Sequence, residues 1–258
     1  MDKPLRQKLY EGQHALGFGL GFPAPGIIEC IGPGWDWVWL DGQHGQHDYR
    51  SLIECVRVAD VRGLPSVVRT SWHEYGIIGP LMDLGASGIM VPMVDSADQA
   101  RQIVHAVRFP PLGARSYGGR RVIDVRGREY CHSANEDVLL VVQIETPGAL
   151  QQAESIAAVD GVDALFFGPD DIKLRLGIPI NAGLLDSDEL MRSLDVVTRA
   201  ARNAGKLAGT ITPTAAVLRR AGAAGCRLNV GGGDVQFLRG GAQQKLSELR
   251  GVAVEQQR

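Results

Sequence analysis

Two acidic residues stand where metal-binding side chains would be useful. Glu145 ends the apolar run VLLVVQIE, and Asp171 closes the motif G-P-D-D that follows the apolar run ALFF. Neither has a histidine or cysteine close to it in the sequence, and an oxygen-only ligand pair suits a hard cation such as Mg²⁺ or Mn²⁺. The pair therefore predicts a divalent-metal site.

Each acid also has a simpler interpretation. Glu145 could form an ion pair with Arg69 on another strand, and either aspartate of G-P-D-D could cap the start of a helix through its side chain. Gln143 precedes Glu145 by two positions. Because strand side chains alternate, we expect Gln143 and Glu145 to face the interior of the fold and Ile144 to face away from it.

Proton transfer needs a side chain that titrates near neutrality, and the loop DGQHGQH contains two of them. His44 follows Asp41 by three residues, and its reference pKa of about 6.5 suits a general acid or base. His47 is the weaker candidate, because only its proximity recommends it. A solvated loop histidine is the simpler interpretation.

The lysines argue against metal-free chemistry, in which a buried lysine at a strand end forms a Schiff base. The five lysines are Lys3, Lys8, Lys173, Lys206 and Lys245. Lys173 is the nearest to a strand end, and the two acids of G-P-D-D beside it favour the charged ammonium over the free amine. The sequence therefore favours a metal over a Schiff base.

Short apolar segments, punctuated by glycine and proline, alternate with amphipathic stretches along the chain. Runs such as VLLVVQIE and ALFF are apolar throughout, as in parallel strands that are covered on both faces. The predicted strands are 15–20, 35–41, 65–69, 88–92, 138–145, 164–167, 207–211 and 227–230. The predicted helices are 25–30, 49–62, 77–84, 97–107, 147–157, 187–204, 213–221 and 235–249.

Eight such units predict an α/β fold, a (β/α)₈ TIM barrel that forms one domain over residues 1–258. A doubly wound open sheet is the alternative, although GFGLGFPAPG lacks the G-x-G-x-x-G spacing that favours it. In barrels of this kind the active site lies at the C-terminal ends of the strands. Asp41, Arg69 and Glu145 each end a predicted strand, so we expect them to meet there.

Two connections, 109–137 and 171–186, are long for a minimal barrel, and long loops are often functional. The first connection could bind an anionic aldehyde through its arginines, or it could face solvent or a neighbouring subunit. These arginines are Arg115, Arg120, Arg121, Arg126 and Arg128.

The bulk composition excludes several classes of protein. The 258 residues are 45% hydrophobic and 22% charged with a net charge of −2, which provides a core and argues against nucleic acid as a partner. The N-terminus lacks an apolar h-region, and no run approaches the roughly 18 apolar residues of a membrane span. We therefore expect a soluble, cytoplasmic protein without a membrane partner. The four cysteines show no C-x-x-C spacing and are expected to be buried free thiols.

Several motifs in order resemble the HpcH/HpaI family of metal-dependent, class II pyruvate aldolases, which includes 2-keto-3-deoxy sugar-acid and 4-hydroxy-2-oxoheptanedioate aldolases. They are WDWVWLDGQHG, PSVVRTSW, LMDLGASGIMVPMV, FPPLGARSYGG, VVQIET and VDALFFGPDDIKLRLG. The resemblance implies a barrel of the phosphoenolpyruvate/pyruvate type. It also implies an aldehyde-lyase (EC 4.1.2 type) that reversibly cleaves a 4-hydroxy-2-keto acid to pyruvate and an aldehyde through a metal-stabilised enolate, with Mg²⁺, Mn²⁺ or Co²⁺ as cofactor.

The resemblance assigns roles to the catalytic residues. Glu145 and Asp171 correspond to the metal ligands of the family. His44 corresponds to the catalytic base, with Asp83 of LMDLG as the acid that orients it, and Arg69 corresponds to the arginine beside the enolate.

Substrate contacts are implied for Arg69, Gln143 and two residues of the G-P-D-D turn, Pro169 and Asp170. Backbone amides of that turn, at a helix start, would hold the substrate carboxylate. The resemblance further implies a homo-oligomer, a hexamer built as a trimer of dimers, whose active site is completed near a subunit interface.

Gln43 departs from the family pattern, which has glutamate immediately before the histidine. Changes around a metal's ligands typically cost about 10- to 100-fold in affinity or activity, so the substitution puts metal preference in question. It keeps two alternatives open. One is an oxaloacetate decarboxylase or another enolate-using enzyme similar to macrophomate synthase, and the other is a barrel without catalytic activity.

Overall fold

The computed structural model describes residues 3–255 and contains a closed barrel of eight parallel strands in sequence order. The strands are β1 Ala15–Leu20, β2 Trp37–Asp41, β3 Ser66–Arg69, β4 Gly88–Val91, β5 Leu139–Ile144, β6 Ala164–Phe167, β7 Leu207–Ile211 and β8 Leu228–Gly233. Strand β8 pairs with β1 and closes the barrel. The predicted (β/α)₈ barrel is therefore confirmed, and the open sheet is wrong. A single domain over 1–258 stays a prediction, and residues 1–2 and 256–258 lie outside the described part.

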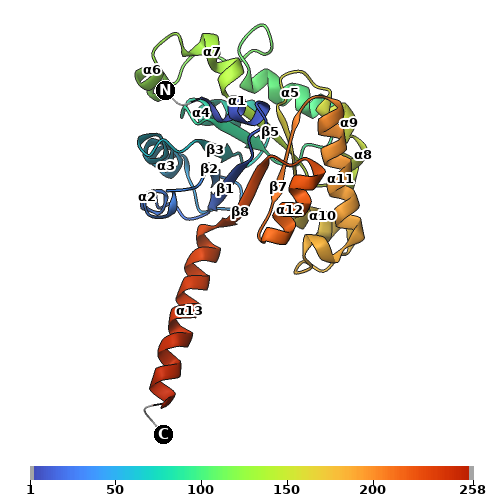
Figure 1. Cartoon of the computed structure of the whole chain (residues 1–258). Helices are drawn as coiled ribbons and strands as arrows, with labels where there is room; N and C mark the ends of the chain where they lie inside the picture. Colours follow the sequence, from blue (N-terminus) through green and yellow to red (C-terminus); the bar gives the residue numbers. More distant parts are fainter. Residues whose placement is uncertain (1–2, 256–258) are drawn as a thin grey trace.

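Helices surround the barrel, as Figure 1 shows. They are α1 Leu5–Tyr10, α2 Gly26–Ile31, α3 Tyr49–Val61, α4 Tyr75–Met82, α5 Ala97–Val107, α6 Arg120–Arg126, α7 Tyr130–Asp137, α8 Pro147–Gln151, α9 Ala153–Ala157, α10 Pro169–Leu176, α11 Asp188–Asn203, α12 Ala215–Ala224 and α13 Asp234–Glu255, with a short 3₁₀ turn, η1, at Leu184–Asp186. The predicted helix 147–157 is two helices. The two long connections are not plain loops, because α6 and α7 lie in the first and α10 and η1 occupy the second.

Side-chain caps explain where five of these helices begin. In each case an oxygen of the residue before the helix accepts a hydrogen bond from a backbone N–H in the first turn, which satisfies a donor that the helix itself leaves unpaired. The capping residues are Asp48 for α3, Ser96 for α5, Thr146 for α8, Ser187 for α11 and Thr214 for α12. These caps fix the residue at which each of the five helices begins.

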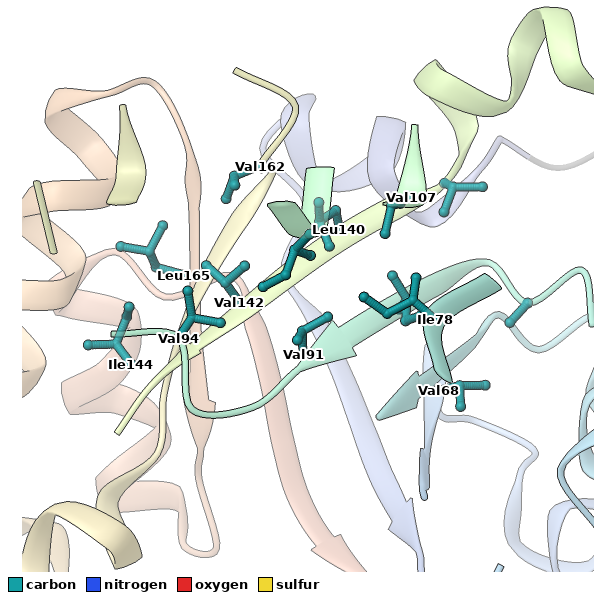
Figure 2. Packing of buried hydrophobic residues seen from close by; sticks show 14 of the residues in the cluster. Val68, Ile78, Val91, Val94, Val107, Leu140, Val142, Ile144, Val162 and Leu165 are labelled. Carbon is teal, nitrogen blue, oxygen red and sulfur yellow. The ribbon is translucent and has the colours of Figure 1, made fainter. Parts of the chain in front are cut away.

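The strands separate two apolar cores. An outer core lies between the strands and the helices, and Figure 2 shows Leu140, Val142 and Ile144 of β5 within it. The alternate residues of β5 face the lumen of the barrel, where Trp37 and Phe166 fill much of the space. A Cβ atom at Gly17 would lie 2.4 Å from the Trp37 ring, so that position on β1 needs glycine.

The last helix, α13, projects away from the barrel (Figure 1). In a barrel of this type the final helix ordinarily packs against the strands. Here large apolar side chains of α13 are exposed instead, including Leu238, Leu246, Leu249 and Val252, which are 49–56% accessible. Separately, no helix within residues 3–255 has the length and apolar character needed to cross a membrane.

The expectation that all four cysteines are buried is wrong in part. Cys55 and Cys226 are buried, but Cys30 is exposed on α2 and Cys131 is half-buried on α7. All four are free thiols. Burial raises the pKa of both Cys55 and Cys226 to about 12, so these two thiols are inert near neutral pH.

Candidate active site

Asp41, the last residue of β2, organises one side of the strand ends. Its carboxylate accepts hydrogen bonds from Nε of Arg69 at 2.9 Å and from Nη2 at 2.6 Å. It also accepts the backbone N–H groups of Gln43 and His44, each at 3.1 Å. Burial alone would raise the pKa of Asp41, but the hydrogen bonds and charge of Arg69 outweigh it and lower that pKa. Asp41 therefore positions both an arginine and the histidine loop.

Arg69 ends β3 and is buried. Its guanidinium lies 4.5 Å from the centre of the Trp39 ring, and its Nη1 donates to Oε1 of Gln143 at 3.4 Å. The alternative in which Arg69 forms an ion pair with Glu145 is wrong, because Asp41 is the carboxylate that Arg69 binds. One edge of the guanidinium is thus fixed by Asp41, and the other faces Gln143.

Glu145 follows directly after β5 and is only 3% exposed. Its Oε1 accepts the backbone N–H of Met93 at 2.8 Å. Met93 has a φ of 56°, a left-handed conformation that is uncommon outside glycine and asparagine. Burial raises the pKa of Glu145, and the charge of Asp171 adds to this effect, while the Met93 hydrogen bond and the more distant arginines oppose it. A carboxylate in this setting is strongly favoured by a nearby cation.

Gly168 makes the room that Glu145 occupies. A Cβ atom at position 168 would lie 2.6 Å from Oε2 of Glu145 and 2.9 Å from its Cβ. Gly168 is also the residue immediately before α10. The close approach therefore brings the first turn of α10, which contains Asp171, next to Glu145.

The two aspartates of G-P-D-D lie in the first turn of α10, where negative charge is favourable. Neither caps the helix, because Gly168 holds the cap position and makes no side-chain cap, so that alternative is wrong. Asp170 accepts from Lys173 at 2.8 Å, and Asp171 accepts from Arg175 at 2.6 Å.

Pro169 is the first residue of α10 and has no N–H group. The expectation that this turn would hold a carboxylate through backbone amides therefore cannot apply to Pro169 as a donor. Within the turn, only the N–H groups of Asp170 and Asp171 are available for that role.

Glu145 and Asp171 fit a hard divalent cation in donor type, since both supply carboxylate oxygens. Among residues 3–255 no group of three or more His, Cys, Asp or Glu side chains is arranged to hold a metal. A cation here would complete its shell with water or substrate oxygens.

Oε1 of Gln43 at the same end of the barrel is buried and has no hydrogen-bond partner in the described part of the chain. Such an atom is suited to accept a hydrogen bond from ordered water.

Among the described residues, His44 and Asp83 share no hydrogen bond or ion pair. His44 is exposed in the loop after β2. Asp83 follows the last residue of α4 and accepts from Nη2 of Arg115 at 3.2 Å. Because α4 leads from the C-terminal end of β3 back toward the start of β4, Asp83 lies away from the strand ends. No hydrogen bond or ion pair between described residues joins it to His44, so the orientation of His44 by Asp83 stays a prediction.

The arginines of the 109–137 connection hold that connection in place. Arg121 donates to the carbonyl of residue 84 and pairs with Asp60, and Arg126 donates to the carbonyl of residue 85 at 2.7 Å. Arg120 pairs with Asp124 one turn along α6. These contacts leave the hypothesis of an anionic-aldehyde site on this connection without support.

A cavity of about 570 Å³ lies elsewhere, lined by residues of α1, α6 and α7 that include Leu5, Val122 and Tyr130. Neither Glu145 nor Asp171 lines it. Cavity size alone therefore does not locate the candidate site. The candidate site is located instead by the buried carboxylate of Glu145 and by Arg69, both at the C-terminal ends of strands.

Comparison with known proteins identifies the family of the chain. The model of the HpcH/HpaI aldolase/citrate lyase family matches residues 18–237. A hydroxypyruvate/pyruvate aldolase of Pseudomonas aeruginosa is 36% identical over 97% of this chain and 94% of its own length. A 4-hydroxy-2-oxovalerate aldolase of Rhodococcus jostii strain RHA1 is 38% identical over 83% of this chain and 84% of its own length.

A solved structure supports the same relationship. An HpcH/HpaI aldolase/citrate lyase family protein from Burkholderia cenocepacia J2315 superposes with a TM-score of 0.86 and 31% identity, over 95% of this chain and 98% of that one. The match to the family model covers most of the chain, and the curated relatives are aldolases. As the motifs predicted, the chain belongs to the HpcH/HpaI aldolase/citrate lyase family and is an enzyme of the aldehyde-lyase class.

Proposed function

We propose that the chain reversibly cleaves a 4-hydroxy-2-keto acid into pyruvate and an aldehyde at the C-terminal ends of its strands. The observation that carries this proposal is the juxtaposition of Glu145 and Asp171, brought together by the close packing of Gly168 against Glu145. Relatives that are named aldolases of pyruvate, hydroxypyruvate and 4-hydroxy-2-oxovalerate support the same substrate class. Their names favour aldol chemistry over the decarboxylase alternative and over a barrel without activity.

Glu145 and Asp171 would hold a divalent cation, with Mg²⁺, Mn²⁺ and Co²⁺ as the candidates. When bound, this cation would supply a Lewis acid for the keto oxygen of the substrate. Arg69 would add positive charge through Nη1, the edge that faces Gln143 rather than Asp41. The N–H groups of Asp170 and Asp171 would bind the substrate carboxylate at the start of α10.

In the cleavage direction the C4 hydroxyl loses its proton to His44, directly or through one water. The carbon–carbon bond between C3 and C4 then breaks, C4 leaves as the aldehyde, and the electron pair stays on the pyruvate fragment as the enolate. Protonation of C3 completes pyruvate. Exposure of His44 to solvent and its place in the loop fixed by Asp41 support this role.

We further propose that the protein is a homo-oligomer in which a second copy completes the site. Within one chain Asp83 pairs with Arg115 and makes no described contact with His44, so we assign the Asp83 that orients His44 to a second copy. The exposed apolar side chains of α13 support association of like subunits, because a stripe of this kind rarely stays solvated. A hexamer is the assembly that the family resemblance implies.

Pyruvate release from a panel of 4-hydroxy-2-keto acids tests the function. After treatment with EDTA, activity should disappear and should return with Mg²⁺, Mn²⁺ or Co²⁺. Glu145→Gln and Asp171→Asn should each lose at least about 100-fold in kcat/KM, because both remove a charged ligand. Glu154→Gln, an exposed substitution on α9, is the matched control and should behave as the wild type.

Three results would contradict the proposal. Full activity in EDTA would show that the reaction needs no divalent metal. A borohydride-trapped lysine adduct with pyruvate would show Schiff-base chemistry. Turnover of oxaloacetate without activity on any hydroxy-keto acid would instead favour the decarboxylase.

A further inference from the structure

We propose that Arg175 is a counter-ion that occupies Asp171 in the metal-free protein and weakens divalent-metal binding at this site. The inference rests on the proposed function, because it takes Glu145 and Asp171 as the metal ligands. It concerns the control of metal affinity by a residue to which the mechanism gives no role.

The contacts of Arg175 are with the parts of the chain that hold both carboxylates. Its Nη1 lies 2.6 Å from Oδ1 of Asp171 and 3.3 Å from the backbone oxygen of the same residue. Its Nη2 lies 3.9 Å from Sδ of Met93, the residue whose N–H binds Glu145. Arg175 therefore lies beside the pair of acids.

The helix itself creates this pairing. Asp171 and Arg175 are four residues apart on α10, so their side chains share one face. Lys173, one turn from Asp170, pairs with that residue instead. Each aspartate of the first turn of α10 thus has its own cationic partner, and the partner of Asp171 is Arg175.

The ion pair of Arg175 is partly open to solvent, whereas Lys173 is buried. The side chains of Arg175 and Asp171 are 35% and 37% exposed, so water can replace either partner. Lys173 is buried and also donates to the carbonyl of residue 180. An ion pair with this exposure is weak, and a cation that binds Asp171 can displace or share it.

Charge gives the direction of the effect. Without Arg175 the two carboxylates would present two negative charges to a metal, and the guanidinium cancels one of them. Repulsion between the guanidinium and a divalent ion on the same carboxylate is sufficient for about tenfold in affinity even at the dielectric constant of water. Removal of Arg175 should therefore tighten metal binding.

Direct metal titration tests this without reference to activity. Mn²⁺ binding to the full-length protein is followed by electron paramagnetic resonance and by calorimetry for the wild type, Arg175→Gln and Arg175→Lys. Arg175→Gln should lower the Mn²⁺ Kd by about tenfold or more. Arg175→Lys keeps the charge and should remain closer to the wild type.

Two controls isolate the site. Arg57→Gln removes another arginine that forms an ion pair on its own helix, with Glu54, and should leave the Kd unchanged. In an Asp171→Asn background, Arg175→Gln should tighten the residual Mn²⁺ binding less than it does in the wild type, because Arg175 is then no longer held beside the metal by Asp171. The difference between wild type and Arg175→Gln should also shrink near 1 M salt, since exposed charges are screened there.

The outcomes separate the inference from the proposed function. If Arg175→Gln binds Mn²⁺ as the wild type does, or more weakly, Arg175 is not a competing counter-ion and the inference fails while the metal site stands. If neither the wild type nor any variant binds Mn²⁺ at this site, the proposed metal pair fails and the inference fails with it. An equal gain in the Asp171→Asn background would also overturn it.

Discussion

Asp41 and Arg69 are register partners at the C-terminal ends of β2 and β3, and two parallel hydrogen bonds of 2.6 and 2.9 Å join them. The same carboxylate accepts two backbone N–H groups from the histidine loop. An arginine held in this bidentate manner has a fixed orientation as well as a fixed position. Asp41 therefore links the side chain proposed to face the enolate with the loop proposed to move the proton.

Asp41→Asn should lower the free energy of unfolding by about 1–3 kcal/mol at pH 7, because Arg69 loses its charged partner. The pKa of Asp41 is lowered in the folded state, so its contribution is present at pH values above the ordinary aspartate pKa of about 4. This contribution is lost as the pH falls through the lowered pKa. Urea unfolding at several pH values measures the difference between the two proteins.

Asp98→Asn is the control for this experiment, because Asp98 pairs with Arg101 in an exposed position. It should change the free energy of unfolding by less than about 0.5 kcal/mol. A loss for Asp41→Asn that stayed constant down to the lowest pH would show that the charge of Asp41 does not stabilise the fold.

Gly168→Ala should weaken metal binding at Glu145 and Asp171. The new Cβ would lie 2.6 Å from Oε2 of Glu145, so either Glu145 or the start of α10 must shift. We expect at least about a tenfold increase in the Mn²⁺ Kd, measured by calorimetry. Gly26→Ala, where an added Cβ meets nothing within 4 Å, is the matched control. Equal metal affinities for both variants would disprove the close approach.

Thiol labelling should distinguish the four cysteines. At pH 8 the native protein should react rapidly with a disulfide reagent at Cys30 and more slowly at Cys131. Cys55 and Cys226 have pKa values of about 12 and present almost no thiolate at that pH, so they should react only after unfolding. Cys30→Ser should abolish the rapid phase. A rapid phase that survives in Cys30→Ser would place another thiol at the surface.

Charges on the apolar stripe of α13 should reduce the mass of the assembly. Leu246→Asp combined with Leu249→Asp places two carboxylates among the exposed apolar side chains, and burial of both between subunits would be costly. Light scattering after size exclusion should then report a smaller species with an intact circular dichroism spectrum. Gln243→Asp on the same helix is the control. A wild type that is already monomeric would refute the proposed oligomer.

The sequence predicted the strands well, because parallel strands that are buried on both faces consist of short, continuous apolar runs. The predicted bounds of β1, β6 and β7 agree with the structure, and alternation along β5 correctly placed Gln143 in the lumen and Ile144 in the outer core. Alternation suffices there because it depends only on local backbone geometry. The opposite faces of one strand are thereby assigned without any knowledge of its neighbours.

Relationships between distant residues were beyond the sequence. Asp83 was assigned to His44 through family resemblance, yet within the chain it pairs with Arg115, a contact fixed by the path of the 109–137 connection. A helix start was expected at G-P-D-D, but the extent of α10 within the 171–186 connection was not predicted; the helix ends at Leu176, before Gly177 in the left-handed conformation. Nor does any local pattern in α13 tell whether a helix returns to its own barrel.

The aromatic packing in the lumen has a consequence for how this enzyme can change. Arg69 lies over the Trp39 ring, and Trp39 contacts Phe166 with ring centres 5.7 Å apart. The position of the Arg69 guanidinium therefore depends on aromatic packing in the lumen. Substitution of any of these rings would disturb the residues above it. New aldehyde acceptors should therefore be reached through libraries of the loops that follow the strands, whereas the lumen should tolerate few replacements. Substrate specificity should therefore be free to change in the loops, while the lumen residues that support Arg69 stay the same.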